Sequence, residues 1–252
     1  MFLDPLVLQV SANAIELGIT LVTLLVPIAW FTRTLRAERG NAEQRNRMLV
    51  LLVLFCAAAV FWLVYDQAGS TVAIFAQEDT ENTVLGKSFP SSWFQSVNPL
   101  LIIALAPVMA IISTALGVRG KQPGTAYNFA GGLLLVAISM GVMVFAAQAA
   151  INGKVEAMWL IAVFAIRAVG ELMLSPVGMA AATRLSPPNR VSQTLGVWFL
   201  ATSVGDAIGG RLAQFYDSLG HAAFFGMLGR IALVATFVVL ALARPLDRLV
   251  PD

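Results

Sequence analysis

Seven apolar stretches, separated by short polar connections, make up most of this chain. They run from Pro5 to Phe31, Met48 to Gly69, Trp93 to Gly117, Tyr127 to Ile151, Met158 to Leu185, Val191 to Phe215 and His221 to Ala243. Each is long enough to cross a bilayer as a helix, and none alternates apolar and polar residues as barrel strands do. Because unpaired backbone groups are costly in lipid, the pattern predicts an all-α integral membrane protein with about seven transmembrane helices.

The composition agrees with this class. Hydrophobic residues make up 58% of the chain and charged residues 12%, with a mean hydropathy of +0.81, whereas soluble domains carry about 25% charged residues. The first apolar stretch is about twice as long as the core of a signal peptide and follows Asp4 in place of a basic patch, so we expect a retained helix. The net charge of +2 gives no reason to expect nucleic-acid binding.

The charges between the stretches predict the topology, because basic residues near span ends stay on the cytoplasmic side. The expected cytoplasmic set is Arg33, Arg36, Arg39, Arg45, Arg47, Arg119, Lys121, Arg184, Arg190, Arg244 and Arg248, and the external connections hold Lys87 and Lys154. The acidic residues Glu78, Asp79 and Glu81 fall in the long external connection. We expect a multi-pass plasma-membrane protein with an external amino terminus and a cytoplasmic carboxyl terminus.

Residues for enzyme chemistry are scarce. Cys56 is the one cysteine and His221 the one histidine, so the chain has no metal-ligand cluster, no Ser/His/Asp arrangement and no Cys/His pair. Gly205, Gly209 and Gly210 lie within an apolar stretch at spacings that favour close helix packing over a phosphate-binding loop. The sequence therefore predicts neither an enzyme nor a cofactor.

Glu171 is the first candidate for function, because it lies near the middle of the stretch from Met158 to Leu185. An intramembrane carboxylate usually faces a cavity or a charged partner. Its alternative interpretation is neutralisation by Arg167, one turn earlier on the same predicted helix. Arg167 is open to both kinds of interpretation as well, functional or structural through snorkelling or a local pair.

Three sequence segments carry a family resemblance. Residues 61–70 read FWLVYDQAGS, residues 92–100 read SWFQSVNPL, and GELMLSPVG at 170–178 is followed by RLSP at 184–187 and GVWFLAT at 196–202. They resemble, in the correct order, motifs of helices seven, eight, and ten to eleven of the proton-coupled oligopeptide transporters, a branch of the major facilitator superfamily. The resemblance covers the chain from Ala42 onward.

The resemblance implies a fold of two six-helix halves around a cavity, of which this chain is similar to the second. The E-x-x-E-R and F-Y-x-x-I-N elements expected of the first half do not occur. Bacterial members carry two extra helices between the halves, and the first apolar stretch occupies the place of the second. This implies a linker-type helix at 1–37, a basic cytoplasmic loop at 38–47, the six-helix half at 48–243 and a cytoplasmic tail at 244–252. It also implies a fragment, a split gene or an internal start.

The resemblance implies a substrate site as well. Glu171 matches a cavity-facing glutamate that receives the peptide amino group, and Asn98 matches an asparagine that hydrogen-bonds the peptide. Asn98 alternatively caps a helix that begins with Pro99. The other matching positions are Trp198, Phe199, Thr202 and Trp62, of which the aromatic residues are alternatively packing residues.

Proton coupling or gating is implied for Asp66, Glu171, Asp206 and Arg167. Asp66 stands where the family's seventh-helix motif usually has glutamate, which is one methylene longer. Asp206 stands where the eleventh helix commonly has asparagine, and the sequence offers no partner for it within this half.

The resulting hypothesis is proton-coupled symport of di- and tripeptides by alternating access, with the peptide at the membrane midplane. The expected partners are the lipid bilayer, peptides, protons and an amino-terminal transporter half that brings the basic part of the site, so the chain alone is not expected to transport. Two alternatives stay open, a remnant or subunit that pairs with a separately encoded half, and a half-size homodimeric carrier. Nitrate or another solute also stays open as the substrate.

Overall fold

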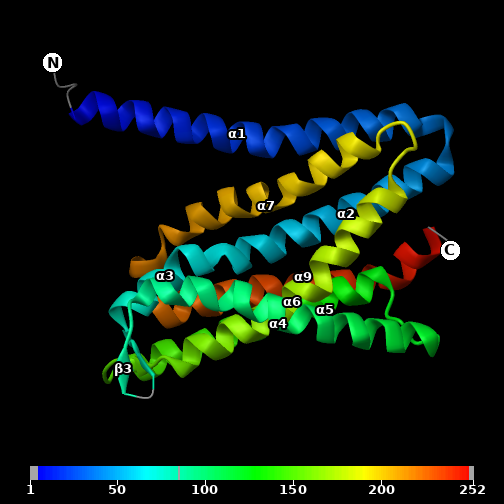
Figure 1. The fold of residues 1–252 in the computed structure, drawn as a ribbon. Coiled ribbons are helices and arrows are strands. Elements are labelled where there is room, and N and C mark those ends of the chain that lie inside the picture. Colours follow the sequence, from blue (N-terminus) through cyan, green and yellow to red (C-terminus); the bar gives the residue numbers. More distant parts are fainter. Residues whose placement is uncertain (1–4, 85, 250–252) are drawn as a thin grey trace.

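The computed structural model of the protein describes the backbone of residues 5–84 and 86–249 and the side chains of 17–84 and 86–246. Asp4 and the side chain of Arg248 lie outside these residues. Each apolar stretch coincides with a long helix (Figure 1). These helices are α1 (Pro5–Ala37), α2 (Ala42–Tyr65), α4 (Phe94–Val118), α5 (Thr125–Ala150), α6 (Met158–Leu185), α7 (Val191–Ala213) and α9 (His221–Leu249). The expected all-helical membrane fold is confirmed.

Six segments of the described chain are long and apolar enough to cross a membrane. They include all of the long helices except α7, with α2 and the short α3 (Thr71–Glu78) counted together. α7 has 23 residues, enough for a crossing, but serine, threonine, Asp206 and Arg211 lower its apolar character. These polar residues make α7 less apolar than the six segments that meet the criterion.

Two expected boundaries differ from the structure. The loop expected at 38–47 is a single 3-10 turn, Glu38–Gly40, after which α2 begins at Ala42. Asn41 makes this early start favourable, because its side chain accepts a hydrogen bond from the backbone N–H of Gln44 (3.1 Å). At the other end α9 continues to Leu249, so the tail expected from 244 is helical as far as it is described.

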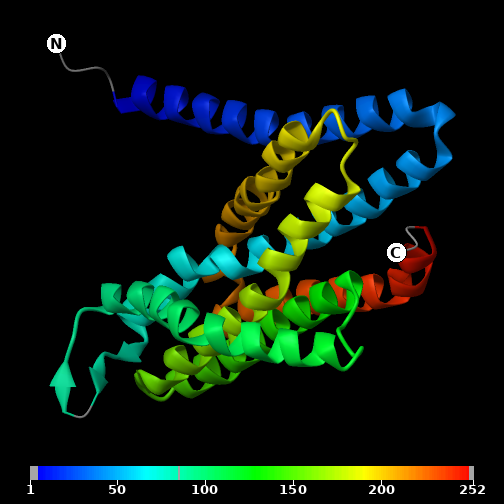
Figure 2. The same ribbon diagram turned by 45° about the vertical axis from the view of Figure 1, so that its right-hand side comes forward.

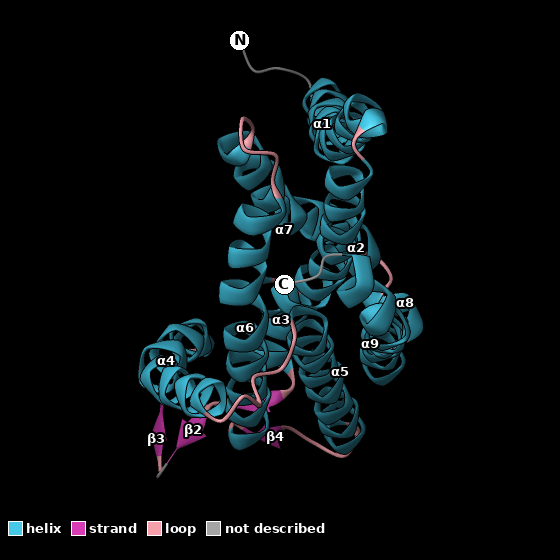
Figure 3. Ribbon diagram, turned by 90° about the vertical axis from the view of Figure 1, so that its right-hand side faces the viewer, coloured by secondary structure: helices cyan, strands magenta, loops and turns pink. Residues whose placement is uncertain are grey.

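The long helices form one bundle in which α5 packs against both α6 and α9, and α2 packs against α7. α1 runs along the outside and packs mainly on α7 (Figures 1 and 2). Viewed along the bundle, α1 and α4 lie at its edges (Figure 3). The window of α4 that is most apolar has no buried residue. α4 therefore presents most of its surface to whatever surrounds this chain.

Small residues allow the closest helix contacts. A Cβ atom on Gly205 of α7 would lie 2.6 Å from the backbone nitrogen of Leu63 and 2.7 Å from the carbonyl oxygen of Ala59, both on α2. A Cβ on Gly209 would lie 3.0 Å from the carbonyl oxygen of Leu63. The close-packing prediction is thus confirmed for Gly205 and Gly209, whereas a Cβ on Gly210 would meet nothing within 4 Å.

Short elements close one end of the bundle. Strand β1 (Thr80–Glu81) pairs in parallel with β4 (Val155–Glu156), and β2 (Thr83–Val84) pairs with β3 (Lys87–Ser88) in a hairpin. The one-turn helix α8 (Tyr216–Leu219) follows α7. Nδ1 of His221, at the start of α9, lies 2.9 Å from Oδ2 of Asp79, at the end of α3. These contacts tie the external connections expected from the sequence to one another.

Candidate substrate and proton site

The candidate site lies where α2 ends, near the middle of the bundle. The chain continues as a 3-10 turn, Asp66–Gly69, before α3 takes over. Buried Gln67 holds this break in place: its Nε2 donates to the carbonyl oxygens of Leu63 (3.2 Å) and Gly209 (3.3 Å). Its Oε1 accepts from the hydroxyls of Ser70 (3.1 Å) and Thr71 (2.9 Å). The break frees backbone carbonyls in the apolar interior, and such groups need partners.

Arg167 of α6 is one of those partners. Its side chain is 0% exposed, and its Nη2 donates to the carbonyl oxygens of Val64 (2.5 Å) and Tyr65. A cation there also suits the negative end of the dipole of α2. Its Nε and Nη1 have no hydrogen-bond partner among the described residues. Arg167 therefore neither snorkels nor bonds Glu171, and the alternative that it neutralises Glu171 locally is not what the structure shows.

Glu171 instead joins a three-residue network. The hydroxyl of Tyr65 donates to Oε2 of Glu171 and accepts from Nδ2 of Asn98 at 2.6 Å. The network thus connects α2, α4 and α6. Asn98 lies inside α4, which already begins at Phe94, so its interpretation as a helix-start cap is wrong. The amide is free for this network because the helix start is provided by the preceding 3-10 turn, Ser91–Trp93.

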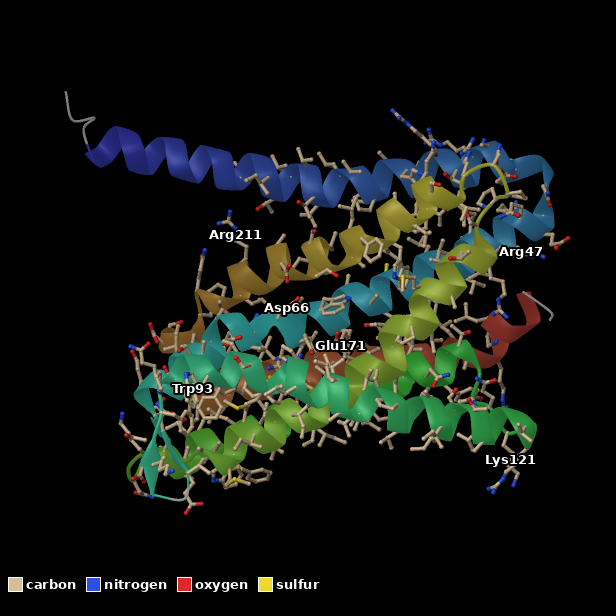
Figure 4. All side chains as sticks on the ribbon, viewed as in Figure 1. Arg47, Asp66, Trp93, Lys121, Glu171 and Arg211 are labelled. Atoms are coloured by element: carbon tan, nitrogen blue, oxygen red, sulfur yellow. The ribbon has the colours of Figure 1, made fainter. Side chains whose placement is uncertain are left out.

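Asp206 of α7 finds its partner across the helix contact with α2. Its carboxyl group lies within hydrogen-bonding reach of the carboxyl group of Asp66. Arg167 and Glu171 of α6 also act electrostatically on Asp66. Asp66 and Glu171 both lie near the middle of the bundle, whereas Arg47 and Lys121 lie at one end and Trp93 at the other (Figure 4).

These groups border one cavity of about 630 Å³, a volume typical of small-molecule sites. Its polar lining residues are Tyr65, Asp66, Gln67, Ser70, Gln95, Asn98, Arg167, Thr202 and Asp206. Glu171 is connected to the cavity through Tyr65 and is not among its lining residues. The structure therefore brings together Asp66, Asn98, Arg167, Thr202 and Asp206 around one space, with Glu171 directly behind.

The three aromatic candidates lie outside the cavity lining of this half. Trp198 is buried: a Cβ on Gly178 of α6 would lie 2.4 Å from its ring, and it meets the ring of Phe129 edge to face. Trp62 packs its ring edge to face against Tyr65, with centroids 5.2 Å apart. Phe199 is 61% exposed. In this half Trp198 packs between helices, Trp62 packs against Tyr65 of its own helix, and Phe199 points outward.

Two residues of the site were missing from the sequence-based candidates. Tyr65 links Asn98 to Glu171, and Gln67 fixes the break after α2. Both belong to the segment 61–70 that carried the resemblance, and Gln67 is a buried amide within an apolar stretch. A buried amide requires hydrogen-bond partners, and this requirement could have identified Gln67 as a structural residue of the site from the sequence.

A polar cavity near the middle of a helical membrane bundle is where transporters of this architecture bind their substrates. Residues 9–227 match the model of the POT family (PTR2), so this chain belongs to the POT family. The resemblance found in the three sequence segments is thereby confirmed, and the family is one of transporters, not enzymes.

Curated relatives include the uncharacterized transporter YclF of Bacillus subtilis, 31% identical over 91% of this chain and 46% of that protein. A di-/tripeptide transporter of Lactococcus lactis subsp. cremoris is 30% identical over 93% of this chain and 48% of its own length. The peptide transporter YePEPT of Yersinia enterocolitica is 34% identical, over 83% and 42%. The chain spans about half the length of the curated relatives it matches.

Solved structures of the family match equally well. The crystal structure of a peptide transporter POT in complex with sulfate superposes with a TM-score of 0.89 at 35% identity, over 96% of this chain and 49% of that one. A POT family transporter in complex with 5-aminolevulinic acid gives a TM-score of 0.86 at 29% identity, over 96% and 51%. The fold is thus that of half a POT transporter structure.

Proposed function

We propose that this chain acts as the second, carboxyl-terminal half of a proton-coupled symporter of di- and tripeptides. The observation that carries the proposal is the network of Glu171, Tyr65 and Asn98 beside a cavity at half depth. A carboxylate held by a phenol presents an acceptor to a peptide amino group, and the amide of Asn98 suits peptide carbonyl or amide groups. The peptide class is carried over from relatives whose printed names are di-/tripeptide and peptide transporters.

The surface of the chain supports a second half as its partner. α4 lies at the edge of the bundle and exposes Leu100, Ile103 and Ile111, although it contributes Gln95 and Asn98 to the cavity. A helix that lines a polar site on one side and exposes apolar side chains on others is suited to face both lipid and another helical half. The partner half would then close the cavity and contribute the cations that the peptide carboxylate requires.

The proposed organisation follows the sequence-based expectations. Residues 1–37 serve as a linker-type helix, and 38–47 form the connection together with the first turns of α2. Residues 48–243 serve as the six-helix half and 244–252 as the tail, which begins within α9. Arg47 and Lys121 lie at one end of the bundle, as the expectation of a shared cytoplasmic side requires (Figure 4). We place that end in the cytoplasm and the amino terminus outside the plasma membrane.

The test uses the protein purified from its source membrane in mild detergent, together with any polypeptide that stays joined or bound to it. After reconstitution into liposomes, an inward proton gradient is expected to drive uptake of a labelled dipeptide, whereas this chain alone gives none. Glu171→Gln is expected to abolish the gradient-driven part while the amount of inserted protein stays constant. Gradient-independent uptake, or uptake unaffected by Glu171→Gln, contradicts the proposal.

The same preparation distinguishes a separately encoded amino-terminal half from a single longer polypeptide. A band near the 26.8 kDa of this sequence with a co-purified membrane protein carrying E-x-x-E-R indicates a separately encoded half. A band about twice as large indicates a single longer polypeptide. Nitrate or another solute that is taken up in place of dipeptide overturns the substrate assignment and leaves the transporter class intact.

A further inference from the structure

The contact between α2 and α7 brings two acids together. Gly205 and Gly209 of α7 lie against the backbone of α2 and its first following residues, close enough that a side chain on either would clash. Asp206 lies between these two glycines in sequence, and Asp66 is the first residue after α2. This helix contact places both acids on the same cavity, where the carboxyl group of Asp206 is a side-chain hydrogen-bond partner of Asp66.

A hydrogen bond between two carboxyl groups has a chemical requirement. An ionised carboxylate only accepts hydrogen bonds, so one of the two groups must carry a proton. Two ionised carboxylates in contact would instead repel each other. Asp66 is half-buried and Asp206 is exposed to the cavity, so a proton on the pair can exchange with water there.

The charged groups around the pair come from α6 and α7. Arg167 and Glu171 of α6 act on Asp66, and Arg211 lies five residues after Asp206 on α7. α4, which also lines the cavity, contains no charged residue. Arg167 is completely buried, lines the same cavity, and has Nε and Nη1 without a hydrogen-bond partner. Two free donors on a buried cation are a receptor for a carboxylate.

We propose that Asp66 and Asp206 share one exchangeable proton, and that the free donors of Arg167 receive a carboxylate of this pair when the proton leaves. The proton goes to cavity water as hydronium, the carboxyl–carboxylate hydrogen bond breaks, and a charge-assisted bond to Arg167 replaces it. Asp206 is a positioning residue, because its carboxyl group holds the proton that it shares with Asp66. This inference rests on the proposed function in one respect only, namely that the shared proton is the one whose movement drives peptide uptake.

The test is infrared difference spectroscopy of the purified protein in lipid nanodiscs, recorded as the pH is raised from neutral. The C=O stretch of a protonated carboxylic acid is separate from the carboxylate bands and shifts in D2O. We expect such a band at neutral pH in the wild-type protein and its loss at alkaline pH. Asp66→Asn and Asp206→Asn should each remove it completely, because an amide donates to the remaining carboxylate and leaves it ionised.

Matched variants distinguish a shared proton from two independent acids. The double variant Asp66→Asn/Asp206→Asn should equal either single variant, whereas independent acids would give additive losses. Asp217→Asn, an exposed acid on α8, and Glu171→Gln should keep the band. Asp206→Glu should restore a band, and Arg167→Gln should move its disappearance to higher pH because the receiving cation is gone. Circular dichroism verifies the helix content of each variant.

A wild-type protein without a neutral-pH band, or an Asp206→Asn variant that keeps it in full, overturns the shared proton. An unchanged pH dependence in Arg167→Gln overturns the role of Arg167. None of these measurements requires transport. A shared proton without dipeptide uptake would therefore refute the proposed function alone, and proton-driven uptake with an unaffected band in Asp206→Asn would refute this inference alone.

Discussion

Gly205→Ala is the sharpest test of the packing that builds the site. The added Cβ would lie 2.6 Å from the backbone nitrogen of Leu63, whereas ordinary contacts begin at 3.4 Å, so α2 and α7 must separate by about 0.8 Å. Overpacking of this kind typically costs about 1–3 kcal/mol, and here the obstacle is rigid backbone. Gly196→Ala on the same helix is the matched control, because its Cβ meets nothing within 4 Å and alanine is the better helix former by about 1 kcal/mol.

The assay is thermal unfolding of both variants in the same detergent, followed by circular dichroism of the helices. The gain in helix propensity is common to both variants, so they should differ by the overpacking cost alone, about 1–3 kcal/mol, or roughly 2–12 °C in Tm for a chain of this size. Gly205→Ala should unfold below the wild-type protein and Gly196→Ala at or above it. Equal unfolding temperatures would refute the claim that α7 packs on α2 through Gly205.

Tyr65→Phe removes the hydroxyl between Asn98 and Glu171 and should lower the free energy of unfolding by about 1–3 kcal/mol, measured in the same assay; an unchanged Tm would contradict the network. Gln67→Leu keeps the volume but removes four hydrogen bonds, so about 2–4 kcal/mol should be lost, and a neutral result would show that the break after α2 does not depend on this amide. Trp198→Ala should cost about 3–5 kcal/mol and Phe199→Ala less than about 1, because the first side chain is 8% and the second 61% exposed; comparable losses would contradict the interhelical position of Trp198.

Several features of this protein were readable from the sequence because they depend on local composition. The length and apolarity of each stretch determine a helix, and every predicted stretch is a helix in the described structure. The segment 61–70 and its two companion motifs were sufficient for the family. The charge distribution predicts which connections share a side, since that rule depends only on the number of basic residues near each helix end.

The predicted first and last residues of helices were less accurate where a single side chain determines the helix end. α2 begins six residues before the expected Met48, because Asn41 caps it and Arg47 and Glu43 pair along its first turns (2.6 Å). Hydropathy gives little weight to such polar first turns, although they are helical. The same holds for the last turns of α9, which extend past the basic residue Arg244.

The partners of the polar residues were decided only by the tertiary structure. Arg167 and Glu171 are one turn apart, which suggested a local pair, yet Arg167 binds the end of α2 and Glu171 binds Tyr65. Asp206 had no partner in its own stretch and finds Asp66 across a helix contact. The physical reason is that helix periodicity fixes the face on which a residue lies but not the helix that faces it. That choice depends on side-chain volume at crossings such as Gly205, where no sequence rule names the opposite residue.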